Sequence, residues 1–138
     1  MAVCMGPHTA VYKINPKSGA LELLSKFLTD FSPKDPISNC CRWSFDNKSL
    51  AVGGDDSVVR LYSVSPKEND PKSMDYSKPL TLTSSFKGHF DAINQIDISR
   101  GGSLLVSSGN DSCASVFNLK TNSLIKKLTF RDIEYRTP

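Results

Sequence analysis

The amino-acid sequence predicts an all-β fold built from repeated four-stranded antiparallel sheets. Residues 49–64 have the pattern of a β-hairpin, because two short apolar runs flank a Gly-Gly-Asp-Asp-Ser turn. The same pattern returns at residues 103–119 and needs no gap to match. A repeated hairpin indicates that the chain is assembled from copies of one structural unit.

Equivalent positions of the two hairpins carry similar residues, and the distance between them defines the repeat. Asp56 and Asp111 are 55 residues apart, and removing the 13-residue segment 66–78 leaves a period of 42. This period falls within the roughly 40–45 residues of a four-stranded β-propeller blade. We therefore expect a partial β-propeller of about two and a half blades. The matched pairs are Leu50 with Leu105, Asp56 with Asp111, Ser57 with Ser112, Leu61 with Val116 and Tyr62 with Phe117.

The composition is that of a soluble globular domain with no charge bias. The 138 residues are 38% hydrophobic and 22% charged, and 17 Lys and Arg against 14 Asp and Glu give a net charge of +3. The basic residues do not form the cluster or stripe that nucleic-acid binding requires. No apolar run approaches the length of a membrane span, and the amino terminus lacks the pattern of a secretory signal. We expect neither nucleic acid nor membrane to contact these residues.

The four cysteines do not have the spacing of a metal site. Cys4, Cys40, Cys41 and Cys113 form no Cys-x-x-Cys pair. Adjacent Cys40 and Cys41 cannot both point to one side of a strand. The sequence favours small buried thiols in a reducing compartment, with no zinc.

Residues 1–31 are predicted to form the second half of a blade. The turn at residues 15–19 has a proline, which fixes φ, and a glycine, which accepts positive φ. Residues 21–28 could form a short amphipathic helix. Eight residues between turns would make a marginal helix, however, and the repeat favours a strand.

Residues 32–87 are predicted to form a complete blade with an insertion. Cys41, Trp43 and Phe45 lie on one face of its first strand, and we interpret Trp43 and Phe45 as core. Segment 66–78 contains almost nothing to bury and is interpreted as a solvated, mobile insertion. The expected strands are residues 38–45, 50–53, 58–64 and 80–86.

Residues 88–130 are predicted to form the next blade, and residues 131–138 the start of another strand or a tail. Its first strand should cover residues 92–98. Alternation there places Ile93, Gln95 and Asp97 opposite Ala92, Asn94, Ile96 and Ile98. The last strand is expected at residues 124–130.

The third unit resembles the glycine-histidine to tryptophan-aspartate pattern of WD-repeat propellers, through Gly88-His89 and Phe117-Asn118. In that family a histidine, a serine or threonine, an aspartate and a tryptophan form a buried hydrogen-bonded chain within a blade. The resemblance assigns these roles to His89, Ser107, Asp111 and Phe117. Phe117 has no indole N–H, so the chain would have three members.

The middle unit matches this pattern less completely. Asp56 and Tyr62 match, whereas Val52 replaces the serine and no glycine-histidine pair precedes the unit. A neutral hydrogen bond contributes about 1 kcal/mol, and a fully buried Val, Leu or Phe about 1.5–3 kcal/mol. We therefore expect apolar packing to hold this blade without the complete chain.

A second resemblance is narrower and suggests a function. The central blades are similar to those of the prolactin regulatory element-binding protein family, the endoplasmic-reticulum guanine-nucleotide exchange factors for the Sar-type small GTPase. Membership would imply a role in coat-protein-II vesicle transport from the endoplasmic reticulum to the Golgi, with a Sar-type GTPase as partner. The location would be the cytosolic face of the endoplasmic reticulum if the parent is membrane-anchored, and otherwise cytoplasmic. The similar residues are 29–32, Cys41, Asp46-Asn47, 50–54 and Val59-Arg60.

Two features of that family do not occur in this chain. One is a glycine-rich, potassium-binding loop in the first blade, and the other is a membrane-spanning helix. We therefore expect an internal fragment that lacks the exchange element and binds no cofactor. The alternative is a non-catalytic WD-repeat scaffold for protein–protein interaction. About two and a half blades would also leave exposed edges that favour self-association.

No group of residues in the sequence has the pattern of a catalytic or metal site. Asp55-Asp56 resembles a carboxylate pair, but aspartates in hairpin turns usually accept hydrogen bonds from backbone N–H groups. Gly53-Gly54 is too short for a phosphate-binding loop, and no helix is expected after it. His89 is interpreted as a buried structural histidine. The sequence therefore predicts no self-contained enzyme.

Overall fold

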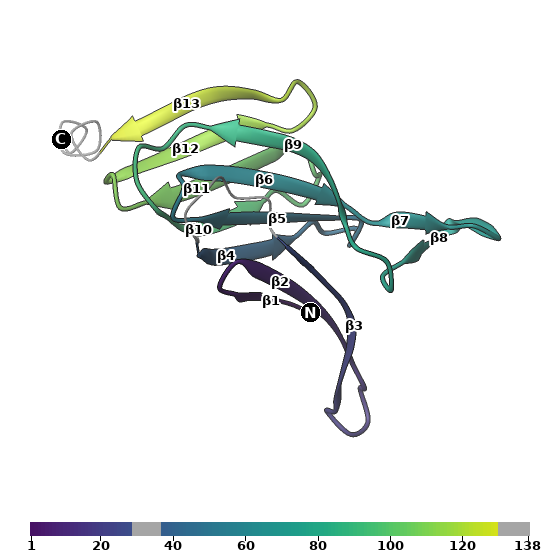
Figure 1. Cartoon of the computed structure of the whole chain (residues 1–138). Coiled ribbons are helices and arrows are strands. Elements are labelled where there is room, and N and C mark those ends of the chain that lie inside the picture. The colour runs from purple at the N-terminus through teal and green to yellow at the C-terminus, as the bar shows by residue number, and fades with distance from the viewer. Residues whose placement is uncertain (29–36, 130–138) are drawn as a thin grey trace.

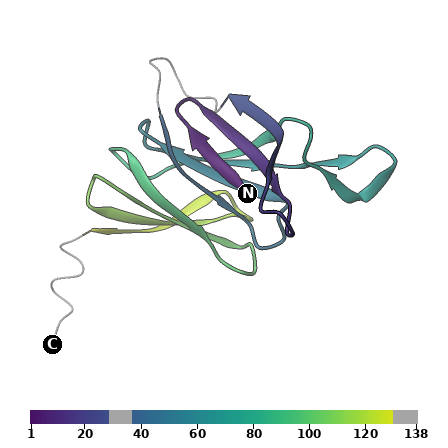
Figure 2. The same ribbon diagram turned by 90° about the horizontal axis from the view of Figure 1, so that it is seen from below.

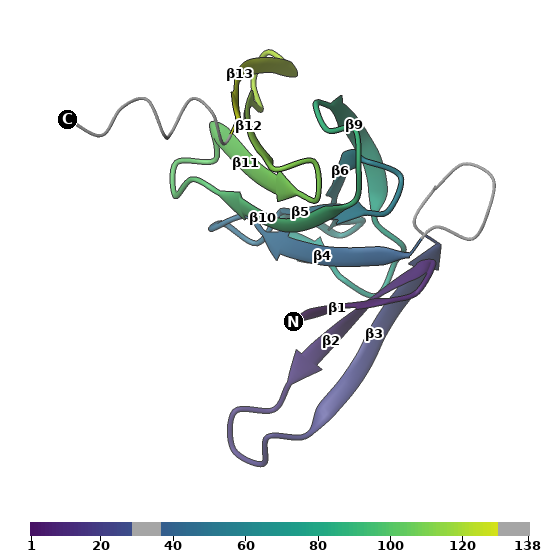
Figure 3. The ribbon, with the colours of Figure 1, turned by 90° about the vertical axis from the view of Figure 1, so that its left-hand side faces the viewer.

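The structure, a computed structural model, describes residues 1–28 and 37–129. These residues form thirteen β-strands and no helix. The strands make three antiparallel sheets that follow one another as neighbouring layers, and a two-stranded hairpin projects from the second sheet (Figure 1). Figure 3 shows the second sheet between the other two. The prediction of an all-β fold of partial propeller blades is confirmed.

Each sheet consists of strands that are consecutive in the chain, apart from the inserted hairpin. The first sheet has the order β1-β2-β3 (Ala2–Met5, His8–Ile14, Leu21–Leu28). The second has the order β4-β5-β6-β9 (Ser38–Trp43, Ser49–Gly54, Val58–Ser63, Thr81–Lys87). The third has the order β10-β11-β12-β13 (Ile93–Ile98, Leu104–Gly109, Cys113–Asn118, Ser123–Thr129). The hairpin consists of β7 (Ser65–Lys67) and β8 (Asp70–Asp75).

The first sheet corresponds to the last three strands of the other two. Strand β1 contacts β4, the first strand of the next sheet. In the same way β5, the second strand of its sheet, contacts β10, so β1 takes the place of a second strand. A bulge also recurs in the last strand of each sheet, β3, β9 and β13, where one extra residue lies opposite the step before an aromatic residue of the neighbouring strand. The extra residues are Leu24, Thr83 and Ile125, and the aromatic residues are Tyr12, Tyr62 and Phe117. Residues 29–32 of the narrower resemblance, Phe130 of the last predicted strand and the predicted tail at 131–138 lie outside the described residues.

Apolar side chains fill both spaces between the sheets. Leu50 and Ala51 of β5 point to opposite faces and are fully buried, so the second sheet contributes to both clusters. Ring pairs Phe27–Tyr62 and Phe86–Phe117 lie 5.0 and 5.2 Å apart between centroids. One cluster contains Val11, Phe27, Leu50, Val52, Tyr62, Val64 and Leu80. The other contains Ala51, Val59, Phe86, Ile93, Ile96, Ile98, Leu105 and Phe117.

The hairpin turns use serine, rather than glycine, for positive φ. Ser57 has a φ of 62° and Ser112 a φ of 56°, whereas Gly53 lies inside β5. A Cβ at Gly53 would lie 2.8 Å from Ile93 Cγ2, so this glycine allows the second and third sheets to approach each other. The backbone amide of Val58 donates to Asp56 Oδ1 at 3.3 Å, and this fits the turn role predicted for the aspartate.

A bulge changes the expected pattern of β10. Strict alternation places Ile93 opposite Ile96 and Ile98, but all three are buried in the same cluster. The register shifts between Ile93 and Gln95, which adds one residue and returns Ile93 to the core face.

One further expectation about the second sheet is wrong, and another holds only in part. Phe45 is 66% exposed rather than core, because β4 ends at Trp43 and the chain turns there. Segment 66–78 also buries more than expected. The hairpin projects from the sheet in Figures 1 and 2, but Met74 and Tyr76 at its base pack against the first cluster. The Tyr76 ring meets Trp43 edge-on at 6.0 Å.

Candidate functional site

The sequence-predicted polar residues of the third sheet form one buried hydrogen-bonded chain. His89 follows β9, Ser107 lies in β11 and Asp111 lies in the β11–β12 turn. His89 Nδ1 is 2.9 Å from Asp111 Oδ1, and His89 Nε2 is 2.8 Å from Ser107 Oγ. Because a carboxylate only accepts hydrogen bonds, His89 Nδ1 is the donor to Asp111. The chain has three members.

Phe117 supports this chain through packing instead of a hydrogen bond. A Cβ at Gly88 would lie 2.8 Å from Phe117 Cζ, so the ring lies directly against the backbone before His89. Ser115 Oγ donates to the Gly88 carbonyl at 3.3 Å. Two side chains of β12 therefore contact the Gly88 backbone.

Asp111 has more partners than the sequence indicates. Its Oδ2 accepts from Lys127 Nζ at 3.1 Å and from the backbone amide of Phe90 at 3.2 Å. Its Oδ1 also accepts from the backbone amide of Cys113 at 3.2 Å. Burial by itself would raise the pKa of Asp111, but hydrogen bonds from His89, Lys127 and the Phe90 amide hold this pKa well below its usual value.

The second sheet replaces this chain with an ion pair. Arg60 Nη2 lies 2.6 Å from Asp56 Oδ2, and the two side chains are only 9% and 16% exposed. Arg60 takes the position that Ser115, 55 residues later in the sequence, has in the third sheet. Tyr62, the other predicted residue, packs against Phe27 between the first two sheets. Sequence reasoning missed Arg60, although its four-residue spacing from Asp56 was visible.

The order Ser107–His89–Asp111 is that of a catalytic triad, but burial of its serine and histidine closes the hydroxyl to a substrate. The residues of the chain satisfy one another, and His89 and Ser107 are buried. Among the residues that the structure describes, no three His, Cys, Asp or Glu side chains are grouped to hold a metal ion. That part of the chain also contains no helix long and apolar enough to cross a membrane. The geometry therefore indicates that the hydrogen-bonded residues His89, Ser107 and Asp111 fix the end of the third sheet.

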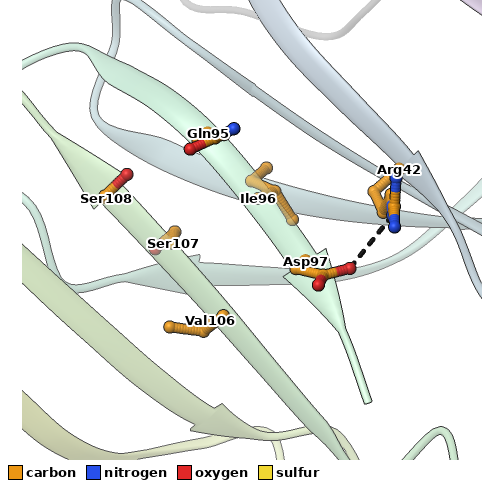
Figure 4. Close-up of a pocket in the computed structure, with 7 residues that line it drawn as sticks. All are labelled: Arg42, Gln95, Ile96, Asp97, Val106, Ser107 and Ser108. Carbon is orange, nitrogen blue, oxygen red and sulfur yellow. Dashed lines mark hydrogen bonds and ion pairs between the residues drawn. The ribbon is translucent and has the colours of Figure 1, made fainter. Parts of the chain in front are cut away.

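A surface hollow of about 270 Å³ lies next to these hydrogen-bonded residues and is lined in part by Ser107 (Figure 4). It is lined by Gln95, Ile96 and Asp97 of β10, Val106, Ser107 and Ser108 of β11, and Arg42 of β4. Its two charged residues neutralise each other, since Arg42 Nε lies 3.0 Å from Asp97 Oδ1. The Asp97 carboxylate also accepts from the backbone amide of Ile98 at 2.9 Å. The hollow therefore presents no uncompensated charge to a ligand, and Ser107, which lines it and is bonded to His89, is only 1% exposed.

An exposed surface, here called the loop rim, lies at the end of the second and third sheets where β4 and β10 begin. Phe90, one of its residues, is 89% exposed, and Lys127 Nζ lies 4.0 Å from the centre of its ring. Hydrogen bonds from Asn39 to Asp55 (2.8 Å) and to the Ile93 carbonyl (3.2 Å) connect the two sheets here. The loop rim consists of Asn39, Asp55, Phe90, Asp91, Asn94 and Asn110, all exposed. Sequence reasoning missed Phe90, although an aromatic residue directly after Gly88-His89 was a signal.

The fold and the buried hydrogen-bonded residues agree with a known family. The family model described as "WD domain, G-beta repeat" matches residues 25–63 and 80–118, together more than half of the chain. The chain therefore belongs to the WD40 repeat family. Each matched stretch runs from the last strand of one sheet through the first three of the next, and the β7–β8 hairpin falls between the two stretches.

Three relatives show which proteins carry similar repeats. Cleavage stimulation factor subunit 50 of Arabidopsis thaliana is 30% identical over 131 residues, which cover 91% of this chain and 30% of that protein. Protein HIRA of Dictyostelium discoideum is 29% identical over 85 residues, covering 61% and 8%. WD repeat-containing protein AAC3 of the same organism is 26% identical over 133 residues, covering 86% and 28%. The chain spans less than a third of the length of each, and none of the three is described as an exchange factor.

Proposed function

We propose that this chain is part of a non-catalytic WD-repeat scaffold that binds a protein partner through the loop rim. The observation that carries the proposal is the 89% exposure of Phe90, whose ring centre lies 4.0 Å from Lys127 Nζ. An exposed aromatic side chain offers a large apolar contact to a partner, and aromatic residues are enriched at protein–protein interfaces. The exposed carboxylates of Asp55 and Asp91 lie on the same rim. They favour a partner segment that combines an apolar side chain with basic or amide donors.

The chain contains a matched control for Phe90 at the opposite end of the sheets. Phe45 is also exposed, at 66%, and Arg100 Cζ lies 4.7 Å from the centre of its ring. Phe45 and Phe90 therefore share a residue type and a cationic neighbour but differ in position. A photoreactive phenylalanine analogue at residue 90 should cross-link a partner that the analogue at residue 45 does not.

Binding measurements with the partner identified in this way test the proposal quantitatively. Phe90→Ala should weaken binding roughly 30-fold, as truncation of a central aromatic contact does. Phe45→Ala should leave the affinity within about twofold of the parent chain. Equal affinities of the parent and the Phe90→Ala variant would reject the loop rim as the binding surface.

The exchange-factor function implied by the narrower resemblance is the second candidate. It predicts that a protein containing these blades accelerates nucleotide release from a Sar-type GTPase and not from unrelated GTPases, because it binds the open nucleotide site preferentially. The relatives support the scaffold more than this candidate, since none of their descriptions names an exchange factor or a GTPase. A nucleotide-release assay with labelled guanosine diphosphate separates the two functions.

A further inference from the structure

Two cysteines from different sheets meet at the interface between the first and second sheets. Cys4 lies in β1 and Cys41 in β4, and both side chains pack against the same apolar cluster. The two thiols share a hydrogen bond. Ser38 fixes the relative position of the two strands, because its amide and its hydroxyl both donate to the Gly6 carbonyl, at 2.8 and 2.7 Å.

The two thiols differ in acidity, and the difference follows from their shared hydrogen bond. The bond from Cys41 outweighs burial and, with bonds from Ser38 and Thr9, lowers the pKa of Cys4 to about 7. The same bond, together with burial, raises the pKa of Cys41. The lowered pKa favours the thiolate form of Cys4, and the raised pKa favours the neutral thiol of Cys41. A nucleophilic thiolate beside a second cysteine is the arrangement of redox-sensitive cysteine pairs.

We propose that Cys4 and Cys41 are a redox modification site that forms a reversible disulfide between the first and second sheets. The oxidant is a hydroperoxide. The Cys4 thiolate attacks the terminal peroxide oxygen, the O–O bond breaks, and Cys4 becomes a sulfenic acid as the alcohol or water leaves. Cys41 sulfur then attacks the Cys4 sulfur, the S–O bond breaks, and the proton of Cys41 leaves with the hydroxyl group as water. In total, two thiols and one hydroperoxide give one disulfide, one alcohol (or water) and one water.

The other two cysteines are directed elsewhere and provide internal controls. The Sγ atom of Cys40 points toward the carbonyls of Gly53 and Ile93, at 3.8 and 3.9 Å, on the opposite side of β4. Burial raises the pKa of Cys40 to about 12. The Sγ atom of Cys113 lies 3.2 Å from the Asp111 carbonyl, in the third sheet. Neither thiol is placed to react with Cys4.

Peptide mapping of the folded chain after treatment with hydrogen peroxide tests the proposal. The remaining thiols are blocked with N-ethylmaleimide, and the chain is digested with trypsin without reduction. We expect a cross-linked peptide between Cys4 and the segment carrying Cys41, with Cys113 alkylated. Because trypsin leaves Cys40 and Cys41 in one peptide, the Cys40→Ser variant identifies the partner and should cross-link like the parent chain. In Cys41→Ser, Cys4 should instead be trapped by dimedone as the sulfenic acid.

Reversibility and stability give a second readout. Dithiothreitol should restore both thiols, and oxidation should raise Tm by at least about 5 °C, because the disulfide closes the loop between residues 4 and 41. Three results would overturn the proposal. The first is cross-linking that is as fast in the urea-unfolded chain as in the folded chain. The second is loss of the cross-link in Cys40→Ser, and the third is oxidation that leaves Cys4 as a free thiol. Because the parent chain and Cys40→Ser supply these results, the test does not depend on Cys41→Ser folding.

Discussion

Arg42 and Asp97 occupy equivalent positions of neighbouring sheets, 55 residues apart, and their side chains bind each other at 3.0 Å. The same relationship holds for Phe45 and Arg100, whose ring and guanidinium group stack 4.7 Å apart. At each of these two positions of the repeat, the second and third sheets carry different residues, and the two residues attract each other. The complementarity connects β4 to β10 along the strand that begins each four-stranded sheet.

The energetic coupling between Arg42 and Asp97 should be small. Both side chains are about 60% exposed, at 60% and 61%, and solvent screens exposed ion pairs. A double-mutant cycle with Arg42→Gln and Asp97→Asn should give a coupling of about 0.2–1 kcal/mol in urea unfolding, and it should decrease with added salt. A coupling of several kcal/mol that salt does not change would contradict this view of the contact.

His89→Ala should lower the free energy of unfolding by about 1–3 kcal/mol. The substitution removes the partner of buried Ser107 and one of the donors to Asp111. Thermal or urea unfolding measures the change. Asn94→Ala, at an exposed position of the same sheet end, is the control and should stay within about 0.5 kcal/mol of the parent chain. Identical unfolding curves for His89→Ala and the parent would contradict a structural role for the hydrogen bonds of His89.

Asp111 should make stability depend on acid pH. Its pKa is lower in the folded chain than in the unfolded chain, so its contribution is fully present above the unfolded value, near 3.9. As pH falls below about 4 toward the depressed folded value, the unfolded chain takes up the proton first and this contribution is lost. Asp111→Asn should therefore be less stable than the parent at neutral pH, and the difference should narrow below pH 4. A constant difference from pH 6 to pH 2 would contradict the shift.

The sequence repeat predicts the backbone more reliably than the side-chain contacts. The 55-residue offset places Ser57 on Ser112 and Asn47 on Gly102, and all four residues have positive φ. A local turn depends on its own few residues, so repeated sequence gives repeated geometry.

Features that depend on distant residues are less visible in the sequence. The bulge in β10 changes which side chains are buried, and period-two alternation cannot indicate where an extra residue enters. The packing of Tyr76 on Trp43 joins residues 33 positions apart across an insertion that lies outside the repeat. The exposure of Phe90 and its contact with Lys127 likewise depend on β13 lying beside β12. The candidate surface could therefore be located only after the sheets were in place.

Gly53→Ala should separate the second and third sheets and destabilise the chain by about 1–3 kcal/mol. A Cβ there would lie 2.8 Å from Ile93 Cγ2 and 2.9 Å from Ile96 Cδ1, and buried β-branched side chains have few alternative rotamers. Urea unfolding measures the cost, and hydrogen exchange should show faster opening of the β10 amides than of the β2 amides. Gly101→Ala is the matched control, since no atom lies within 4 Å of a Cβ there and its φ is not positive. It should be neutral or slightly stabilising, because alanine restricts the unfolded chain. Equal stability of the two variants would show that the sheets can separate at Gly53 without cost, and would contradict close packing as the reason for glycine at this position.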